Sequence, residues 1–241
     1  MTLDDLLDGL FSQRRNISRD GGALTGQATL KDGRAVEIVG VYDATPLGVD
    51  EAIRLSRHVL DALTRGGENP IFVLVDSGSQ RMSKRDELLG LNEFLGHLAK
   101  CLIWAEIQGR RTLSVLYGSS LAGAIIVTAL STSTLLALPG AKPEVMDLPS
   151  MSKVTKLPLA VLEQKAKATP VFAPGVDNMV KTGSVLEVCK DVSALADKIA
   201  GLLGASRDRN DNRGLLGRDR GGRPKAADIA RRIHDLARSA S

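Results

Sequence analysis

The sequence predicts an α/β fold in which helices cover a sheet, and two kinds of segment carry this prediction. Ile71–Val75 and Leu113–Leu116 are short and almost purely apolar, as is typical of strands buried inside a covered sheet. Segments with apolar residues at helical spacing alternate with such strands along the chain. The 241 residues, 43% of them hydrophobic, suffice to bury a sizeable core. This alternation of strand and helix indicates the α/β class.

The first half of the chain is predicted to supply a helix, a hairpin and the first buried strand. The helix covers Thr2–Arg15, because its apolar residues recur on one face. The hairpin turns at Lys31–Arg34, where Asp and Gly stand together. The other expected elements are strands Gln27–Leu30 and Ala35–Val41, a loop Thr45–Gly48, a helix Val49–Thr64, the strand Ile71–Val75, a turn Asp76–Ser79, and one or two helices over Lys84–Ile107 with Gly90 and Gly96 as weak points.

The second half repeats the alternation with weaker signals. Ser193 is a plausible N-cap for its last strong helix, and Ser206–Pro224 has the composition of a mobile linker. The expected elements are the strand Leu113–Leu116, a turn Tyr117–Ser120, a helix Leu121–Ala129, a strand Thr134–Leu138, a strand Glu144–Leu148, helices Ser150–Thr155 and Leu159–Ala168, a strand Val185–Cys189, a helix Ser193–Leu203 and a helix Lys225–Ala237. We expect three parts: an N-terminal helix and lead-in at 1–25, a main domain at 26–204, and a basic C-terminal extension at 205–241.

The charge and composition exclude several classes of function. The net charge of +4 arises from the tail, because Ala205–Ser241 holds ten basic against five acidic residues and the remainder holds 22 against 23. A neutral body and 3% aromatic residues argue against nucleic-acid binding. The uncharged segment Leu121–Leu138 is better explained as a helix and a strand than as a membrane span. Two distant cysteines and an acidic start without a signal peptide predict a cytoplasmic protein.

Two small-residue segments form the candidate site. Each leaves a buried strand and enters a helix: Ser77-Gly78-Ser79 follows the first strand, and Gly118–Gly123 follows the second. Ligands of α/β sheets gather at the carboxyl ends of strands. We therefore predict that backbone N–H groups around Gly78, Ser79, Ala122 and Gly123 converge as an oxyanion hole. The open alternative is a pair of tight turns in which Gly and Ser satisfy geometry alone.

A nucleophilic site is the other interpretation of the second segment. Gly118-Ser119-Ser120-Leu121-Ala122 differs from the G-x-S-x-G motif at its last position, which would make Ser120 the nucleophile. Such a serine needs a base. The three histidines, at 58, 97 and 234, lie in helical or tail segments that favour packing or solvent exposure. The sequence has neither metal-ligand spacing nor a Walker A or Rossmann motif.

Four sequence motifs resemble the carboxyltransferase subunits of the crotonase superfamily. They are, in the family's order and spacing, Gly40-Val41-Tyr42, PIFVLVDSGSQ (Pro70–Gln80), SVLYGSSLAGA (Ser114–Ala124) and LLALPGAKPEVM (Leu135–Met146). Within that group the whole chain is similar to the γ subunits of biotin-independent malonate decarboxylase. The resemblance implies a crotonase-like ββα spiral over roughly residues 26–200. The sequence departs from the family in lacking a Pro within Asp76–Ser79 and in having Gly123 alone where many relatives have two or three glycines.

The resemblance also implies an activity and partners. A homologous β subunit would pair with the chain and decarboxylate malonyl-S-acyl carrier protein to the acetyl thioester and CO2. An α subunit of transferase type would load malonate. The chain itself would bind no cofactor, since the phosphopantetheine-type arm belongs to the acyl carrier protein. The proton that the enolate carbon needs has two candidate donors here, Tyr117 and Ser120, and the β subunit is a third source.

Three other functions stay open at this point. The chain could be a carboxyltransferase subunit of a biotin-dependent acyl-CoA carboxylase. It could be a non-catalytic scaffold that completes its partner's pocket. A serine hydrolase built on Ser120 is the fourth hypothesis. The absence of acidic residues between Ile107 and Pro143 argues against a hydratase, which would place a Glu just inside this helix.

Overall fold

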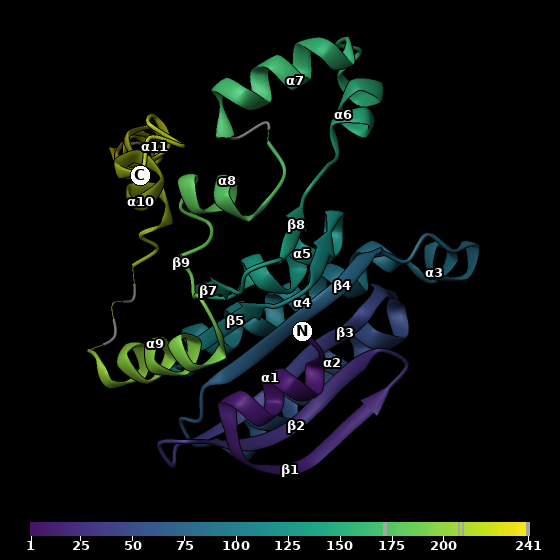
Figure 1. Ribbon diagram of the computed structural model, residues 1–241, viewed down its shortest axis with the longest axis vertical. Helices are drawn as coiled ribbons and strands as arrows, with labels where there is room; N and C mark the ends of the chain where they lie inside the picture. Colours follow the sequence, from purple (N-terminus) through teal and green to yellow (C-terminus); the bar gives the residue numbers. More distant parts are fainter. Residues whose placement is uncertain (171–172, 207, 209, 240–241) are drawn as a thin grey trace. The chain divides into compact units, whose positions relative to one another are not determined.

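Seven strands form the central sheet of the computed structural model, which describes residues 1–170, 173–206, 208 and 210–239 (Figure 1). Their spatial order is β1-β2-β3-β4-β5-β7-β9. The first three strands pair antiparallel, and β3, β4, β5, β7 and β9 pair parallel. Their bounds are β1 Phe11–Asp20, β2 Ala23–Leu30, β3 Ala35–Leu47, β4 Ile71–Gln80, β5 Thr112–Leu116, β7 Thr134–Ala137 and β9 Glu187–Val188. A second, two-stranded sheet pairs β6 (Ser119–Leu121) with β8 (Lys142–Glu144).

Helices cover this sheet, which confirms the predicted α/β class. In Figure 1, α1 lies in front of the sheet, and α2 and α4 lie behind it. The helices of this part are α1 Leu3–Leu10, α2 Val49–Arg65, α3 Lys84–Leu89, α4 Leu91–Ile107, α5 Ala122–Val127, the 3-10 turn Ala129–Ser131, and α9 Val192–Gly204. Every residue of Ile71–Val75 is buried, as is every residue of β5. Burial on both faces explains why these strands read as apolar runs.

The chain divides into two compact units. Met1–Val145 and Glu187–Ser206 form the first, and Met146–Leu186 and Arg207–Ser241 form the second. The second unit holds α6 Leu148–Thr155, α7 Leu159–Ala168, α8 Val176–Lys181, α10 Arg213–Asp219 and α11 Ala226–Ser239. Within it, Arg220 donates to the carbonyl oxygens of Val180, Val185 and Leu186 at 2.9 Å each. The boundaries of these two units differ from those of the expected parts 1–25, 26–204 and 205–241. The three parts stay a prediction.

The N-terminal region differs from its prediction. The helix ends at Leu10 rather than Arg15, and Phe11–Asp20 is strand β1. This strand lies at the edge of the sheet and pairs only with β2 among the described strands. Its polar sequence suits an edge that faces water, and for that reason it lacks the apolar signature of the buried strands. The sequence pattern therefore does not predict this strand.

Helix boundaries follow local backbone chemistry. Lys84–Ile107 is two helices, divided at Gly90, whose φ of +84° is left-handed and favours glycine. Gly96 does not interrupt α4. The N-cap of α9 is Asp191, which accepts from the Ala194 N–H at 2.8 Å, and the expected cap Ser193 lies inside the helix. The predicted linker 206–224 contains helix α10.

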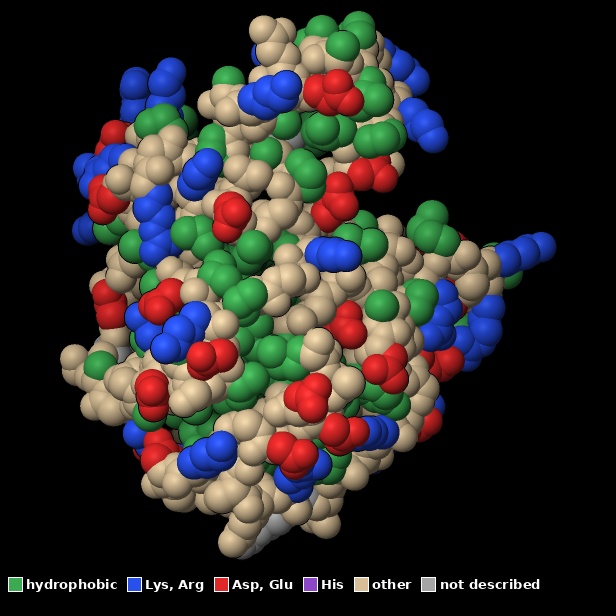
Figure 2. Space-filling view, viewed as in Figure 1, with side chains coloured by type: hydrophobic (Ala, Val, Ile, Leu, Met, Phe, Trp, Pro, Cys, Tyr) green, Lys and Arg blue, Asp and Glu red, His purple; other side chains and the backbone are tan. Residues whose placement is uncertain are grey.

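Charged side chains of both signs are interspersed over the face that Figure 2 displays. No helix in the described part of the chain combines the length and apolar character needed to cross a membrane.

Candidate functional site

The two segments predicted to form the site lie side by side in the first unit. Strands β4 and β5 pair in register up to Val75 and Leu116, an offset of 41 residues (116 − 75). The first segment is not a turn, because β4 continues as a strand through Asp76–Gln80. Likewise Ser119–Leu121, expected within a turn and helix start, is strand β6 of the small sheet. The extension of β4 contacts β6 and α5.

Three side chains of the β4 extension hold the second segment, each across the same offset of 43 residues. Asp76 Oδ1 accepts from the Ser119 N–H at 2.8 Å. The hydroxyls of Ser77 and Ser120 are 2.8 Å apart. Gln80 Oε1 accepts from the Gly123 N–H at 2.9 Å. We call this arrangement the clasp, formed by Asp76, Ser77 and Gln80 with 119–123.

The offset grows from 41 to 43 because two residues, Tyr117 and Gly118, intervene between the end of β5 and the start of β6. Close packing in this passage requires glycine. A Cβ built at Gly118 would overlap the Asp76 carboxylate that caps Ser119. A Cβ at Gly78 would lie 2.9 Å from the carbonyl oxygen of Ala44 on β3. Both glycines therefore permit close approach between segments.

The four residues predicted to present backbone donors are Gly78, Ser79, Ala122 and Gly123, and all are half-buried. Ala122 has a φ of +49°, a left-handed conformation that costs a non-glycine residue roughly 1–2 kcal/mol. This conformation lies at the first residue of α5 and turns the chain out of β6. The Gly123 N–H, the predicted donor at the start of α5, already faces Gln80 Oε1. Nothing in the sequence predicts that Gln80 is the acceptor of this N–H.

Ser120 is fully buried, and its hydroxyl is bonded to that of Ser77. None of the three histidines, all of which are described, is hydrogen-bonded to Ser120. His58 Nε2 lies 3.1 Å from Glu37 Oε2, and His97 Nε2 lies 3.5 Å from Cys101 Sγ. His234 faces Asp235 on α11. A nucleophilic Ser120 would thus have neither an accessible hydroxyl nor a bonded imidazole.

Tyr117 is 5% exposed, and its hydroxyl has no hydrogen-bond partner among the described residues. Burial raises the pKa of this phenol well above its ordinary value of 10, and the nearby carboxylates Asp76 and Asp43 raise it further. The hydroxyl therefore stays protonated at neutral pH. Asp43 and Ala44 beside it have left-handed φ values of +57° and +49° at the irregularity in β3. Tyr117 thus carries a proton at the carboxyl end of β5, but its raised pKa makes it a weak acid and its hydroxyl is buried.

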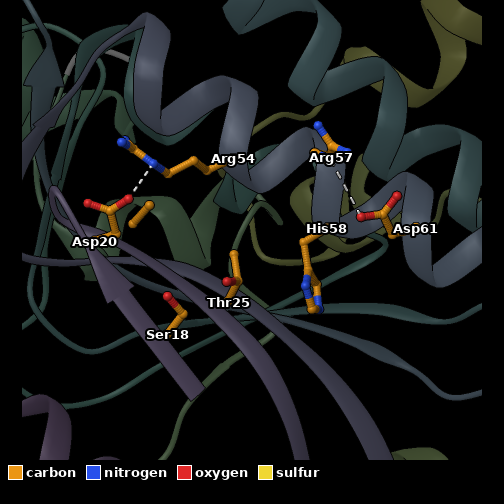
Figure 3. Close-up of a pocket in the computed structure, with 8 residues that line it drawn as sticks. Ser18, Asp20, Thr25, Arg54, Arg57, His58 and Asp61 are labelled. Carbon is orange, nitrogen blue, oxygen red and sulfur yellow. Dashed lines mark ion pairs between the residues drawn. The ribbon is translucent and has the colours of Figure 1, made fainter. Parts of the chain in front are cut away.

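A separate pocket of about 300 Å³ lies between α2 and the edge of the sheet (Figure 3). Two ion pairs line it: Arg54 Nε lies 2.7 Å from Asp20, and Arg57 Nε lies 3.8 Å from Asp61. These four charges sum to zero, so the pocket has no strong attraction for an anion. The other lining residues are Ser18, Ala23, Thr25 and His58. Among the described residues, no three or more His, Cys, Asp or Glu side chains gather as a metal site.

Comparison with known proteins adds an independent line of evidence. Residues 43–237 match the family model described as malonate decarboxylase gamma subunit. The malonyl-S-ACP:biotin-protein carboxyltransferase MADD of Malonomonas rubra is 29% identical over 197 residues, which cover 73% of this chain and 67% of the relative.

Two solved structures match nearly the full length. A chain of the Pseudomonas malonate decarboxylase hetero-tetramer in complex with coenzyme A has a TM-score of 0.78 at 20% identity, covering 98% of this chain and 97% of that chain. A chain of the Pseudomonas MdcD–MdcE hetero-dimer has a TM-score of 0.72 at 21% identity, with the same coverage. At these identities the likeness concerns the fold alone, and it agrees with the expected crotonase-like α/β fold.

Proposed function

This chain belongs to the malonate decarboxylase gamma-subunit family, and we propose that it acts with a homologous β subunit to decarboxylate malonyl-S-acyl carrier protein. The products are acetyl-S-acyl carrier protein and CO2. The match over residues 43–237 is the observation that carries this proposal. The Pseudomonas relatives that assemble as a hetero-dimer and a hetero-tetramer support the heteromeric part of it.

The reaction breaks the bond between the malonyl methylene carbon and the carboxylate. The electron pair of that bond moves into an enolate, whose negative charge rests on the thioester oxygen. Fixed N–H donors stabilise this charge, and loss of one typically costs about 3–4 kcal/mol. We assign this task to the backbone around Gly78, Ser79, Ala122 and Gly123, and the clasp between the two segments that carry these residues supports the assignment.

The enolate carbon must then gain a proton. Of the two predicted donors we favour Tyr117, because its hydroxyl is protonated and has no partner among the described residues, whereas the Ser120 hydroxyl is bonded to that of Ser77. Both hydroxyls are buried, so substrate must reach the donor through a local opening of the site. A tyrosine that gives up its proton needs it restored from water or from the partner subunit. The β subunit stays the alternative source of this proton.

We propose the other components of the complex from the family resemblance. The malonyl group arrives on the phosphopantetheine-type arm of the acyl carrier protein, so this chain itself binds no cofactor. An α subunit of transferase type loads malonate onto that arm. We place the complex in the cytoplasm, which suits Cys101 and Cys189, both free and buried.

Two alternatives have specific support. Similarity to MADD favours transfer of the carboxyl group to biotin instead of its release as CO2. The engagement of the Gly123 N–H by Gln80 favours a scaffold role, in which the partner holds the working oxyanion hole. Both retain the heteromeric assembly and differ in where the carboxyl group goes and in which subunit's donors matter.

The test is release of labelled CO2 from malonyl-S-acyl carrier protein by the chain with and without its β subunit. Gly123→Pro removes the N–H, and Gly123→Ala keeps it as the matched control. We expect activity only with the partner and a loss of about 10²–10³-fold in Gly123→Pro. Gly123→Ala should change the rate far less, because it keeps the N–H and its Cβ, 3.1 Å from Gln80 Oε1, displaces only the end of a flexible side chain. Full activity of Gly123→Pro would establish the scaffold role, and dependence on added biotin would establish the carboxyltransferase.

A further inference from the structure

Gln80 ends strand β4 and differs from the other two members of the clasp. Its amide oxygen accepts from the Gly123 N–H at 2.9 Å, in a half-buried position. Among the described residues, the opposite end of the amide makes a single contact of 3.9 Å, from Nε2 to the sulfur of Met82. Met82 itself is 78% exposed, so this contact adds little restraint. One neutral hydrogen bond therefore holds the Gln80 side chain in place.

The remaining two contacts of the clasp are built to persist. The Ser77 and Ser120 hydroxyls are fully buried, so separating them would leave unsatisfied polar groups. The Asp76 carboxylate fills the space beside Gly118 while it caps Ser119. The Ser119 and Gly123 N–H groups are both half-buried, but Gln80 has the longer and more flexible side chain of the two acceptors and carries no charge. The Gln80 contact is therefore the one that can exchange without disturbing the core.

The group that Gln80 presents is chemically equivalent to the proposed ligand. A primary amide and a thioester each offer an sp² carbonyl oxygen to an N–H donor. Gln80 Oε1 lies 2.9 Å from the Gly123 nitrogen, so the acceptor position of this N–H is already filled by that oxygen. Gln80 and a thioester therefore compete for one donor.

We propose that Gln80 is an internal ligand of the oxyanion hole, whose amide oxygen occupies the thioester position until the malonyl thioester displaces it. This inference rests on the proposed function. Gln80 would thereby set the affinity for the acyl thioester and keep the donor from binding water or other small carbonyl compounds between turnovers. It is a positioning residue, since it leaves the donor before chemistry begins.

The proposal fixes the sign of the effect of mutation. Gln80→Ala and Gln80→Met remove the competing oxygen, and Met preserves most of the side-chain length. Because a neutral hydrogen bond makes a modest net contribution, both variants should lower KM for malonyl-S-acyl carrier protein by about two- to tenfold. Gln80→Glu offers a stronger, charged acceptor and should raise KM by about tenfold. A merely structural glutamine would instead lose activity in Ala and Met.

The experiment uses the complex with the β subunit and a matched control, Gln108→Ala, at an exposed glutamine just after α4. The rate constant kcat and KM are measured for each variant. In parallel, NMR follows hydrogen exchange of the Gly123 amide in the labelled chain. Exchange should accelerate in Gln80→Met and slow again when a malonyl–pantetheine ketone analogue, with CH2 in place of sulfur, is added to the complex.

An unchanged or raised KM in both Gln80→Ala and Gln80→Met overturns the proposal, even where Gly123 exchange accelerates. A different result would contradict the proposed function. If Gly123→Pro abolishes CO2 release while Gln80 variants behave as wild type, only the internal-ligand inference is lost. If the wild-type complex releases no CO2, the decarboxylase proposal fails, and analogue protection of the Gly123 amide still decides whether that N–H binds a carbonyl.

Discussion

Glu37→Gln should destabilise the first unit by about 3 kcal/mol at neutral pH. Glu37 is 2% exposed and lies on β3, where its carboxylate accepts from Gln27 at 2.8 Å and Arg65 at 3.0 Å and lies 3.1 Å from His58 Nε2. Burial acts to raise the pKa of Glu37, but the hydrogen bonds from His58, Gln27 and Arg65 outweigh it and lower that pKa to about 2. The carboxylate thus ties helix α2 to the sheet.

The magnitude and its pH dependence follow from this pKa. The ordinary value is 4.5, and the fall to about 2 corresponds to about 3 kcal/mol of folding free energy. Because the folded-state pKa is depressed, this contribution is fully present above pH 4.5. It is lost progressively as the pH falls from 4.5 towards 2, where the folded state also binds the proton.

The measurement is chemical denaturation of wild type and Glu37→Gln at several pH values between 7 and 2.5, followed by circular dichroism. The difference in unfolding free energy should be largest at pH 7 and shrink below pH 4.5. Glu68→Gln, at an exposed carboxylate in the loop after α2, is the control and should change stability by less than about 0.5 kcal/mol. Equal effects of the two substitutions, or a difference independent of pH, would refute the reasoning.

Three further predictions concern the site. Ser77→Ala and Ser120→Ala should each destabilise the chain by about 1–3 kcal/mol in denaturation experiments, because each leaves the other buried hydroxyl without its partner. The double variant should destabilise the chain by less than the sum of the two single variants. Gly118→Ala should displace the Asp76 carboxylate and lower the melting temperature together with CO2 release. Tyr117→Phe should leave stability unchanged or raise it by up to about 1 kcal/mol, since the hydroxyl is unpartnered, while the rate of CO2 release falls at least tenfold.

Each of these has a contrary result. Additive effects of the two serine substitutions would mean that the hydroxyls are not coupled. For Gly118→Ala the control is Gly96→Ala, where a Cβ meets no atom within 4 Å in helix α4 and should stabilise by about 0.5–1 kcal/mol. A lower melting temperature in the control would contradict the close-approach argument. Unchanged turnover of Tyr117→Phe would assign the proton to the partner subunit.

Local patterning was sufficient for much of the fold. The buried segments Ile71–Val75 and Leu113–Leu116 lie in neighbouring parallel strands as predicted, because strands covered on both faces must be apolar throughout. Helix α7 begins and ends where its pattern predicted, and α2 extends one residue beyond Thr64. The family resemblance rested on motifs in these same segments and was confirmed by the family match.

Other features depended on contacts distant in the sequence. Strand β1 has a polar sequence because it lies at the edge, and nothing local marks Phe11–Asp20 as sheet. Asp76–Gln80 has the small, polar composition of a turn, yet it stays extended because β3 pairs with it on one side and 119–123 is bonded to it on the other. Composition alone favours the turn, and tertiary hydrogen bonds favour the strand.

The sequence by itself determined the α/β class, the places of the buried strands along the chain, and the two segments that make the candidate site. These properties follow from short-range periodicity and residue size. Only the tertiary structure decided that Asp76, Ser77 and Gln80 each form a hydrogen bond with the residue 43 positions later in the chain. It also decided that the Gln80 amide oxygen already accepts from the Gly123 N–H. The physical reason is that a hydrogen bond between strands depends on register, and register is fixed by the packing of the whole sheet.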